Sequence, residues 1–241
     1  MLDGDDTVAS VGVTRMRLSV AGRACTGYQF GAVATHPARR GCGHSRELLQ
    51  QVLESIDALA APVLLFANED VRDFYPRFGF RPLPQQRYVA EIALAGGTTL
   101  PPCCDVANAR DRARLAELCR RAAVHDAQFG AGDYYSTLLW HLSYRALRAH
   151  WLDDVDALAV VSEENGTLHL HELLAPQRFD LSAVLPRLAR QPAKRIEFGF
   201  QPRHGWLQTA DAGEYTGSPL FVRGLDTLRP GALRFPDLAQ T

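Results

Sequence analysis

Hydrophobic and polar positions along the first part of the chain predict a hairpin, a helix and a buried strand. Residues 7–20 are rich in valine and threonine and partly alternate, and an alanine–glycine pair then predicts a turn before a second β-like run at 25–35. Between 44 and 59, leucine, valine and isoleucine recur at helical spacing. The continuous apolar run at 63–67 predicts a strand that is buried on both faces.

The pattern continues with a short helix at 71–77 and a strand at 87–94, and then changes in composition. Residues 96–106 concentrate glycine, threonine and proline, which suits a linker and cannot continue a helix or a central strand. We therefore predict a first domain over 1–95 and a second over 107–241.

The second part of the chain repeats an order of elements found in the first. Its predicted elements are helices at 107–124, 134–149 and 181–190 and strands at 156–162, 167–174 and 195–200. The strand, helix, strand order of 167–200 matches that of 27–67, although the sequences differ. This predicts two copies of one fold.

Composition and charge narrow the classes of function. The chain has 241 residues, 46% of them hydrophobic, and 26 basic against 27 acidic side chains, which argues against binding to a nucleic-acid backbone. Lys194 is the only lysine and lies in neither a P-loop nor a kinase motif, which argues against Walker-type NTPases, kinases and Schiff-base enzymes. Five cysteines without C-x-x-C spacing fit a reducing cytoplasm, and no signal peptide or membrane span is predicted.

A proline and two glycines join the strand that ends near Thr35 to the helix that follows. Glycines let the backbone turn tightly, so that consecutive N–H groups and the positive end of the helix dipole converge on an anion. Gly41 and Gly43 would leave room for a pyrophosphate, and Arg40 could add charge. The alternative is a tight turn without any ligand.

The residues R-G-C-G-H-S at 40–45 resemble the acetyl-CoA loop of the GNAT superfamily of N-acetyltransferases. The first glycine of the family pattern falls on Gly43, and Ser45 stands where the family has a final small residue. The resemblance implies that the preceding strand hydrogen-bonds the pantetheine arm. The acetyl-CoA contacts that it implies are Val33, Ala34, Thr35, Arg40, Gly41, Gly43, His44 and Ser45.

A second motif, from Asn68 to Phe80, resembles the family's asparagine followed by a helix with Phe-Tyr and closed by Gly-Phe. By this resemblance Asn68 binds the pantetheine and Tyr75 protonates the departing thiolate of coenzyme A. A tyrosine O–H is also a donor at neutral pH on general grounds. The alternative for Tyr75 is a half-buried packing role.

The resemblance covers residues 7–94 and implies an α/β (α+β) fold with a mixed, mostly antiparallel sheet and flanking helices. Family members begin with a strand and two helices that have no counterpart before Asp6, which suggests a mis-assigned start, a fragment or a replacement. The second domain is similar to a degenerate copy without the glycine loop and is expected not to bind acetyl-CoA. This pairing resembles the two-domain Eis-like branch.

The function that the resemblance implies is direct transfer of an acetyl group from acetyl-CoA to a primary amine of unknown size, without a metal. A water chain, Glu69 or the carboxylate of Thr241 could act as the general base. The alternative is a catalytically silent binding or regulatory module. Because a sheet without its first strand and covering helices would expose apolar surface, a homo-oligomer is a further expectation.

Other polar residues are given little weight. His169 and His171 share a face of one strand and could form half of a metal site, but no cluster completes it. Cys42 could act as a thiol nucleophile with His36 or His44 as its base. The remaining histidines of the predicted helices, His125, His141 and His150, are expected at the surface or as caps.

Overall fold

The computed structural model describes residues 1–202, 210–226, 228, 231 and 233–241. The α-helices of this part of the chain are α1 (His44–Asp57), α2 (Ala109–Arg121), α3 (Tyr135–Tyr144) and α4 (Leu181–Val184). The first seven strands are β1 (Leu2–Asp3), β2 (Asp6–Thr7), β3 (Ala9–Val20), β4 (Arg23–Thr35), β5 (Val63–Phe66), β6 (Arg81–Pro82) and β7 (Gln86–Leu94). The others are β8 (Phe129–Gly132), β9 (Arg148–Leu152), β10 (Ala157–Glu164), β11 (Thr167–Leu174), β12 (Ala193–Phe198), β13 (Ala210–Glu214) and β14 (Leu220–Arg223).

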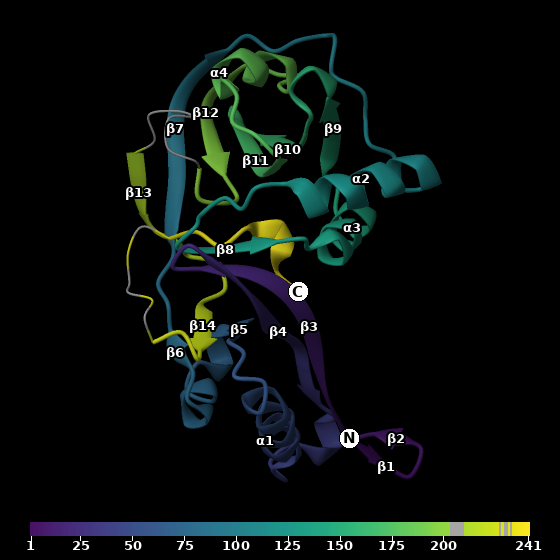
Figure 1. Ribbon diagram of the computed structural model, residues 1–241, viewed down its shortest axis with the longest axis vertical. Coiled ribbons are helices and arrows are strands. Elements are labelled where there is room, and N and C mark those ends of the chain that lie inside the picture. Colours follow the sequence, from purple (N-terminus) through teal and green to yellow (C-terminus); the bar gives the residue numbers. More distant parts are fainter. Residues whose placement is uncertain (203–209, 227, 229–230, 232) are drawn as a thin grey trace.

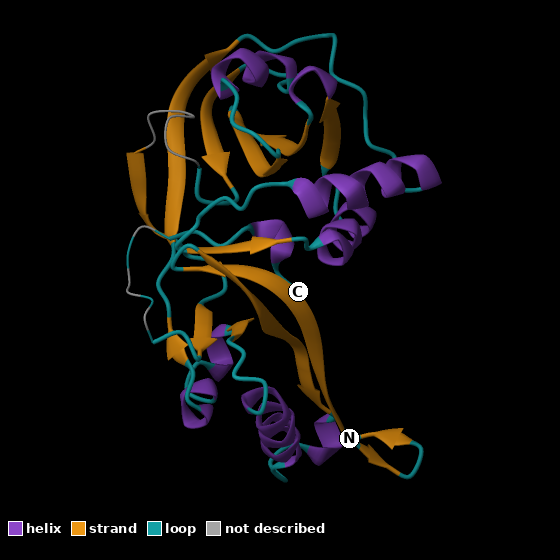
Figure 2. Cartoon of the chain, viewed as in Figure 1, coloured by secondary structure: helices purple, strands orange, loops and turns teal. Residues whose placement is uncertain are grey.

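Two six-stranded sheets with the same internal plan form the body of the molecule (Figures 1 and 2). The first sheet has the order β6-β14-β5-β4-β3-β8, and the second has the order β13-β7-β12-β11-β10-β9. In each sheet the single parallel pair, β4 with β5 and β11 with β12, belongs to a strand, helix, strand unit, and the other pairs are antiparallel. The predicted fold class and the repeated order of elements are therefore confirmed.

The two sheets exchange strands. β7 follows the elements of the first sheet in sequence but pairs with β12 of the second, and β14 follows those of the second sheet but pairs with β5 of the first. β8 also joins the first sheet, beside β3. The predicted linker at 96–106 lies between β7 and α2. However, β7, which precedes it, belongs to the second sheet, and β8 and β14, which follow it, belong to the first. The division into 1–95 and 107–241 therefore stays a prediction.

The strand β5 lies in the middle of the first sheet and is buried on both faces, as its apolar run predicts. Val63 and Leu65 pack on one side, against Leu49 and Leu53 of α1. Leu64 packs on the other side, in a core that includes α2, α3 and the C-terminal residues 233–239. Side chains alternate along a strand, so one short apolar run serves two cores. A further core packs α4 against the second sheet.

Several predicted elements are shorter than expected, and prolines account for two of them. The predicted helix at 71–77 is instead a pair of 3-10 helices, at Glu69–Val71 and Tyr75–Phe78, the second with Pro76 in its first turn. The predicted helix at 181–190 ends at Val184 and continues as a 3-10 turn that contains Pro186. The predicted helix at 134–149 was wrong beyond Tyr144, because 148–152 forms β9.

The three helix histidines expected at the surface are buried, which corrects that expectation. His125 is hydrogen-bonded to Glu172, which also accepts a hydrogen bond of 2.6 Å from Tyr134 Oη. His150 is fully buried beside the predicted linker, where Nδ1 lies 2.9 Å from the Pro101 carbonyl oxygen. His141 Nε2 donates to the Gln240 carbonyl oxygen at 2.8 Å, and burial lowers the pKa of the ring. These groups connect elements of the interior.

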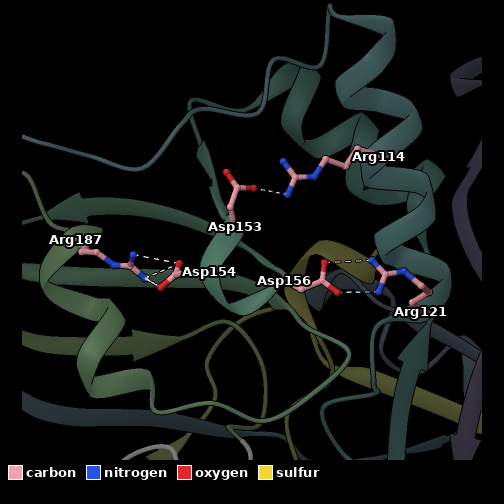
Figure 3. A network of polar contacts seen from close by, with 6 residues as sticks. All are labelled: Arg114, Arg121, Asp153, Asp154, Asp156 and Arg187. Carbon is pink, nitrogen blue, oxygen red and sulfur yellow. Dashed lines mark hydrogen bonds and ion pairs between the residues drawn. The ribbon is translucent and has the colours of Figure 1, made fainter.

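Three arginines hold the turn between β9 and β10, as Figure 3 shows. Arg114 and Arg121 of α2 pair with Asp153 and Asp156, and Arg187 pairs with Asp154. All of these side chains are about half exposed, and such pairs contribute little individually. They fix α2 and the 3-10 turn that follows α4 to the β9–β10 turn.

No described helix has both the length and the apolar character needed to span a membrane.

A chain that ends at residue 96 is expected to be insoluble or to unfold without cooperativity. It would lack β14 and β8 and would leave the edges of β5 and β3 unpaired. The control is the full chain with a protease site inserted at 98–100, whose two fragments should stay associated after cleavage through the β7–β12 and β14–β5 pairings. Size-exclusion chromatography measures whether the cleaved fragments stay associated, and thermal unfolding measures the cooperativity of the 1–96 fragment. A soluble, monomeric 1–96 fragment that unfolds cooperatively would refute this prediction.

Candidate functional site

A gap opens between β4 and β5 because β4 contains a bulge. The last residues paired between them are Phe30 and Leu65. Just beyond, Ala32 and Val33 lie opposite one residue of β3, and Ala32 has a positive φ of 48°. A bulge bends its strand, and bulges are common beside active sites. After the bulge, Ala34 and Thr35 pair with β3 on one side, and residues 33–35 leave the edge that faces β5 free of any described strand.

The loop after β4 presents unpaired backbone N–H groups at the start of α1. Gly43 directly precedes the helix with φ of 87°, and no side chain caps the helix. The first hydrogen bond of the helix runs from the Glu47 N–H to the Gly43 oxygen, so the N–H groups of 44–46 have no partner within the helix. Together with the helix dipole, they form a place for an anion.

Glycine is required in this loop by conformation, and its lack of a side chain leaves open space. Gly41 has φ of 81°, and at both Gly41 and Gly43 a Cβ atom would meet nothing within 4 Å. A hydrogen bond between the hydroxyls of Thr35 and Ser45 ties the end of β4 to the first turn of α1. The predicted residues 33–45 are thus held as one cradle with room in front of the backbone.

Two other predicted binding residues border this cradle with exposed side chains. Arg40 is exposed and, in the described part of the chain, forms no ion pair, whereas its neighbour Arg39 pairs with Asp3 at 2.8 Å. Asn68 lies two residues after the end of β5, and its exposed side chain does not cap the 3-10 helix that it precedes. Both side chains are available to a ligand in the gap. Their predicted roles as acetyl-CoA contacts stay predictions.

Tyr75, the predicted proton donor, lies in an aromatic cluster on the α1 side of the first sheet. Its ring is 6% exposed and packs edge-on against Phe74 and Phe80 and at a tilt against Phe221, with ring centroids 5.4 to 6.0 Å apart. Burial raises the pKa of the phenol, so the group is protonated at neutral pH. Tyr75 can therefore donate a proton, and its catalytic role stays a prediction.

The corresponding gap in the second sheet is filled by the chain itself. β11 and β12 separate after Leu170 and Phe198, and there the N–H of Asp237 donates to the Gly199 oxygen at 2.8 Å. The start of α4 is capped by Asp180, whose side chain accepts from the Ser182 N–H. A carboxylate at this helix start repels an anion, while Gly43 leaves the start of α1 free. These contacts give a physical basis for the expectation that the second domain does not bind acetyl-CoA.

Gln29 is a residue of the site that sequence analysis missed. It is fully buried on β4, where its Nε2 donates to the Ala239 oxygen at 2.8 Å and its Oε1 accepts from the Thr241 N–H at 2.7 Å. These bonds hold the C-terminal residues against β4, where a Cβ on Gly31 would lie 2.6 Å from Thr241 Oγ1. The signal in the sequence was a glutamine between two aromatic residues of a strand, Tyr28 and Phe30.

Replacing Gln29 with alanine is expected to release the C-terminal residues. The Ala239 oxygen and the Thr241 N–H would lose their partner, and a buried polar group without one costs about 1–3 kcal/mol. Thermal unfolding should show the loss of stability, and carboxypeptidase should remove Thr241 faster than from the wild type. Gln51→Ala, on the exposed face of α1, is the control and should change neither measurement. Equal rates of digestion in Gln29→Ala and wild type would contradict the assignment.

The other chemistry considered for the chain finds little support in the geometry. Cys42 is exposed, and its sulfur contacts the Arg40 oxygen at 3.8 Å; among the described contacts it has none with His36 or His44. His171 lies 2.7 Å from Ser162 Oγ, and burial lowers its pKa to about 4. No group of three or more metal-ligating side chains occurs in the described residues.

Comparison with known proteins identifies the first part of the chain. Residues 1–83 match the family model described as an acetyltransferase (GNAT) domain. This match includes both sequence motifs, so the comparison supports the resemblance of the amino-terminal region to GNAT acetyltransferases. No curated protein matches the chain by sequence.

Solved structures share the fold over nearly the whole chain. A GCN5-related N-acetyltransferase from Kribbella flavida has a TM-score of 0.61 at 19% identity, over 94% of this chain and 60% of its own. Eis1 from Mycobacterium abscessus has a TM-score of 0.59 at 16% identity, over 92% of this chain and 63% of its own. A probable N-acyltransferase from Enterococcus faecalis V583 has a TM-score of 0.57 at 13% identity, over 92% of this chain and 60% of its own. The chain thus spans about 60% of the length of these structures, and the likeness concerns the fold.

Proposed function

We propose that the protein transfers the acetyl group of acetyl-CoA to a primary amine by direct attack. The observation that carries this proposal is the open edge of the bulged strand β4 beside an uncapped helix preceded by two glycines with positive φ. The gap accepts an extended chain that ends in a diphosphate, because it offers strand-like hydrogen bonds along one wall and free N–H groups at its end.

Each part of the cradle has a role in this proposal. The N–H groups at the start of α1 and the guanidinium of Arg40 bind the diphosphate, while the edge of β4 at 33–35 and Asn68 bind the pantetheine arm. The thioester supplies an activated acetyl group. Tyr75 keeps its proton at neutral pH because burial raises its pKa, and it gives this proton to the leaving sulfur.

The acceptor must arrive as a free amine, and two of the residues considered as its base lie in different surroundings. Glu69 is exposed and paired with Arg72 at the surface. Thr241 lies against β4 through Gln29 and Gly31, at the point where the strand leaves β5. We therefore place the acceptor on the Thr241 side of β4, opposite α1.

Thermal unfolding with and without acetyl-CoA, followed by thiol release with a panel of amines, tests the function. A ligand at one hundred times its Kd stabilises by about 2.7 kcal/mol, so Tm should rise by several degrees. Thiol release should depend on the added amine. A rise in Tm without thiol release for any amine would instead favour the silent binding module. No rise in Tm would contradict acetyl-CoA binding.

A further inference from the structure

A hollow on the acceptor side of β4 is formed by residues from three separate parts of the chain. It has a volume of about 300 Å³ and is lined by Thr14, Ser136, Thr137, Trp140 and Thr241. Thr14 belongs to β3, and Ser136, Thr137 and Trp140 belong to α3, which lies beside the C-terminus in Figure 1. The volume is at the small end of the range for ligand pockets.

The hollow adjoins the place where the acetyl group is expected. Thr14 is paired directly with Gln29 of β4, and Thr241 lies against Gly31. These two positions flank Phe30, the last residue of β4 paired with β5. A molecule in the hollow therefore lies beside the start of the gap, on the face opposite α1.

The side chains that line the hollow are aromatic or carry hydroxyl groups, and Thr241 also brings the carboxylate considered above as a general base. Trp140 is 54% exposed, and its ring contacts the rings of His141 and Tyr144. Hydroxyl groups of serine and threonine supply the polar contacts, and no charged side chain lines the hollow. An indole face binds flat apolar groups well. Apart from the Thr241 carboxylate, the described lining residues offer no negative charge for the further amines of a polycation.

We infer that this hollow is the acceptor subsite and that it selects primary amines carried on an aromatic or flat apolar group, with Trp140 as the stacking surface. The inference rests on the proposed acetyltransferase function. A larger hollow of about 650 Å³ is lined by Glu69, Asp73 and Glu214 among others, but it lies along β6 and β14, and its lining includes no residue of β4 or β5. That position separates it from the start of the gap.

Steady-state acetylation by the full chain tests the inference, with tryptamine as the aromatic amine and spermidine as the polyamine. Trp140→Ala should raise the KM for tryptamine about tenfold, or about 1.4 kcal/mol, with little change in kcat or in the Kd of acetyl-CoA. Trp140→Phe should restore most of the affinity. Leu59→Ala is the control, because Leu59 is also an exposed apolar side chain, at 62%, and does not line the hollow.

Two results would overturn the inference while leaving the acetyltransferase function intact. They are an unchanged KM for tryptamine in Trp140→Ala and a wild-type preference for spermidine. If no amine is acetylated, calorimetric titration with tryptamine tests the subsite independently of the acetyltransferase function. Binding of tryptamine that Trp140→Ala abolishes supports the subsite, and no binding to the wild type overturns it.

Discussion

Gly43→Arg is expected to abolish the binding of acetyl-CoA. The arginine side chain would occupy the open space in front of Gly43, where the diphosphate is expected to meet the N–H groups of α1. The added positive charge cannot compensate, because the backbone groups that match the diphosphate become inaccessible. Isothermal titration should give no measurable heat with the variant and clear saturation with the wild type. Arg40→Ala should weaken binding less, since it removes charge and leaves the space open.

Two variants separate this effect from backbone strain. Gly43 has a positive φ, so any side chain there costs about 1–2 kcal/mol. Gly43→Ala carries the same strain with a small side chain and should keep measurable binding. Gly166→Arg places an arginine at φ of 73° in the β10–β11 turn, also in open space, and should bind acetyl-CoA like the wild type. Wild-type affinity in Gly43→Arg would show that this loop is not the cradle.

Tyr75→Phe is expected to lower turnover by roughly 10²-fold or more while keeping the affinity for acetyl-CoA, the usual scale for loss of a general acid. The change removes one oxygen from a ring that packs against Phe74, Phe80 and Phe221, so the aromatic cluster should stay intact. The measurement is kcat for thiol release at neutral pH, with Kd from titration and Tm from thermal unfolding.

Tyr28→Phe is the matched control for this substitution. Tyr28 lies on β4 and packs against the same cluster, but neither sequence motif includes it. The control should keep both turnover and stability. Turnover in Tyr75→Phe equal to that of the wild type would remove Tyr75 from the mechanism, and its role would then be packing alone.

Local patterns predicted the elements that hold the candidate site. The two strands of the valine- and threonine-rich hairpin, the amphipathic helix and the apolar run at 63–67 each carry their signal in a short local stretch, and they appear as β3, β4, α1 and β5. Gly43 was predicted as the turn into the helix for the same reason. Its positive φ is a requirement of the local backbone, which a sequence expresses directly.

Contacts between distant parts of the chain were beyond local patterns. The exchange of β7 and β14 between the sheets is a choice of partner, and the residues of each strand would suit either sheet. Gln29 meets Thr241 across more than two hundred residues, and nothing near either position indicates the other. The contribution of α3 to the lining of the acceptor hollow is also a contact between distant parts of the chain. In the sequence, Trp140 is simply one apolar residue of a predicted helix, and nothing near it indicates the hollow.

The central claim is that the cradle at 33–45 delivers an acetyl group to an amine, and the stoichiometry of the products tests it most directly. Free thiol and acetylated amine should be measured in the same sample of full-length protein, acetyl-CoA and tryptamine, by thiol titration and mass spectrometry. The account predicts equal amounts of the two products, and neither product from Gly43→Arg. Thiol release without acetylated amine, or equal activity in Gly43→Arg, would contradict it.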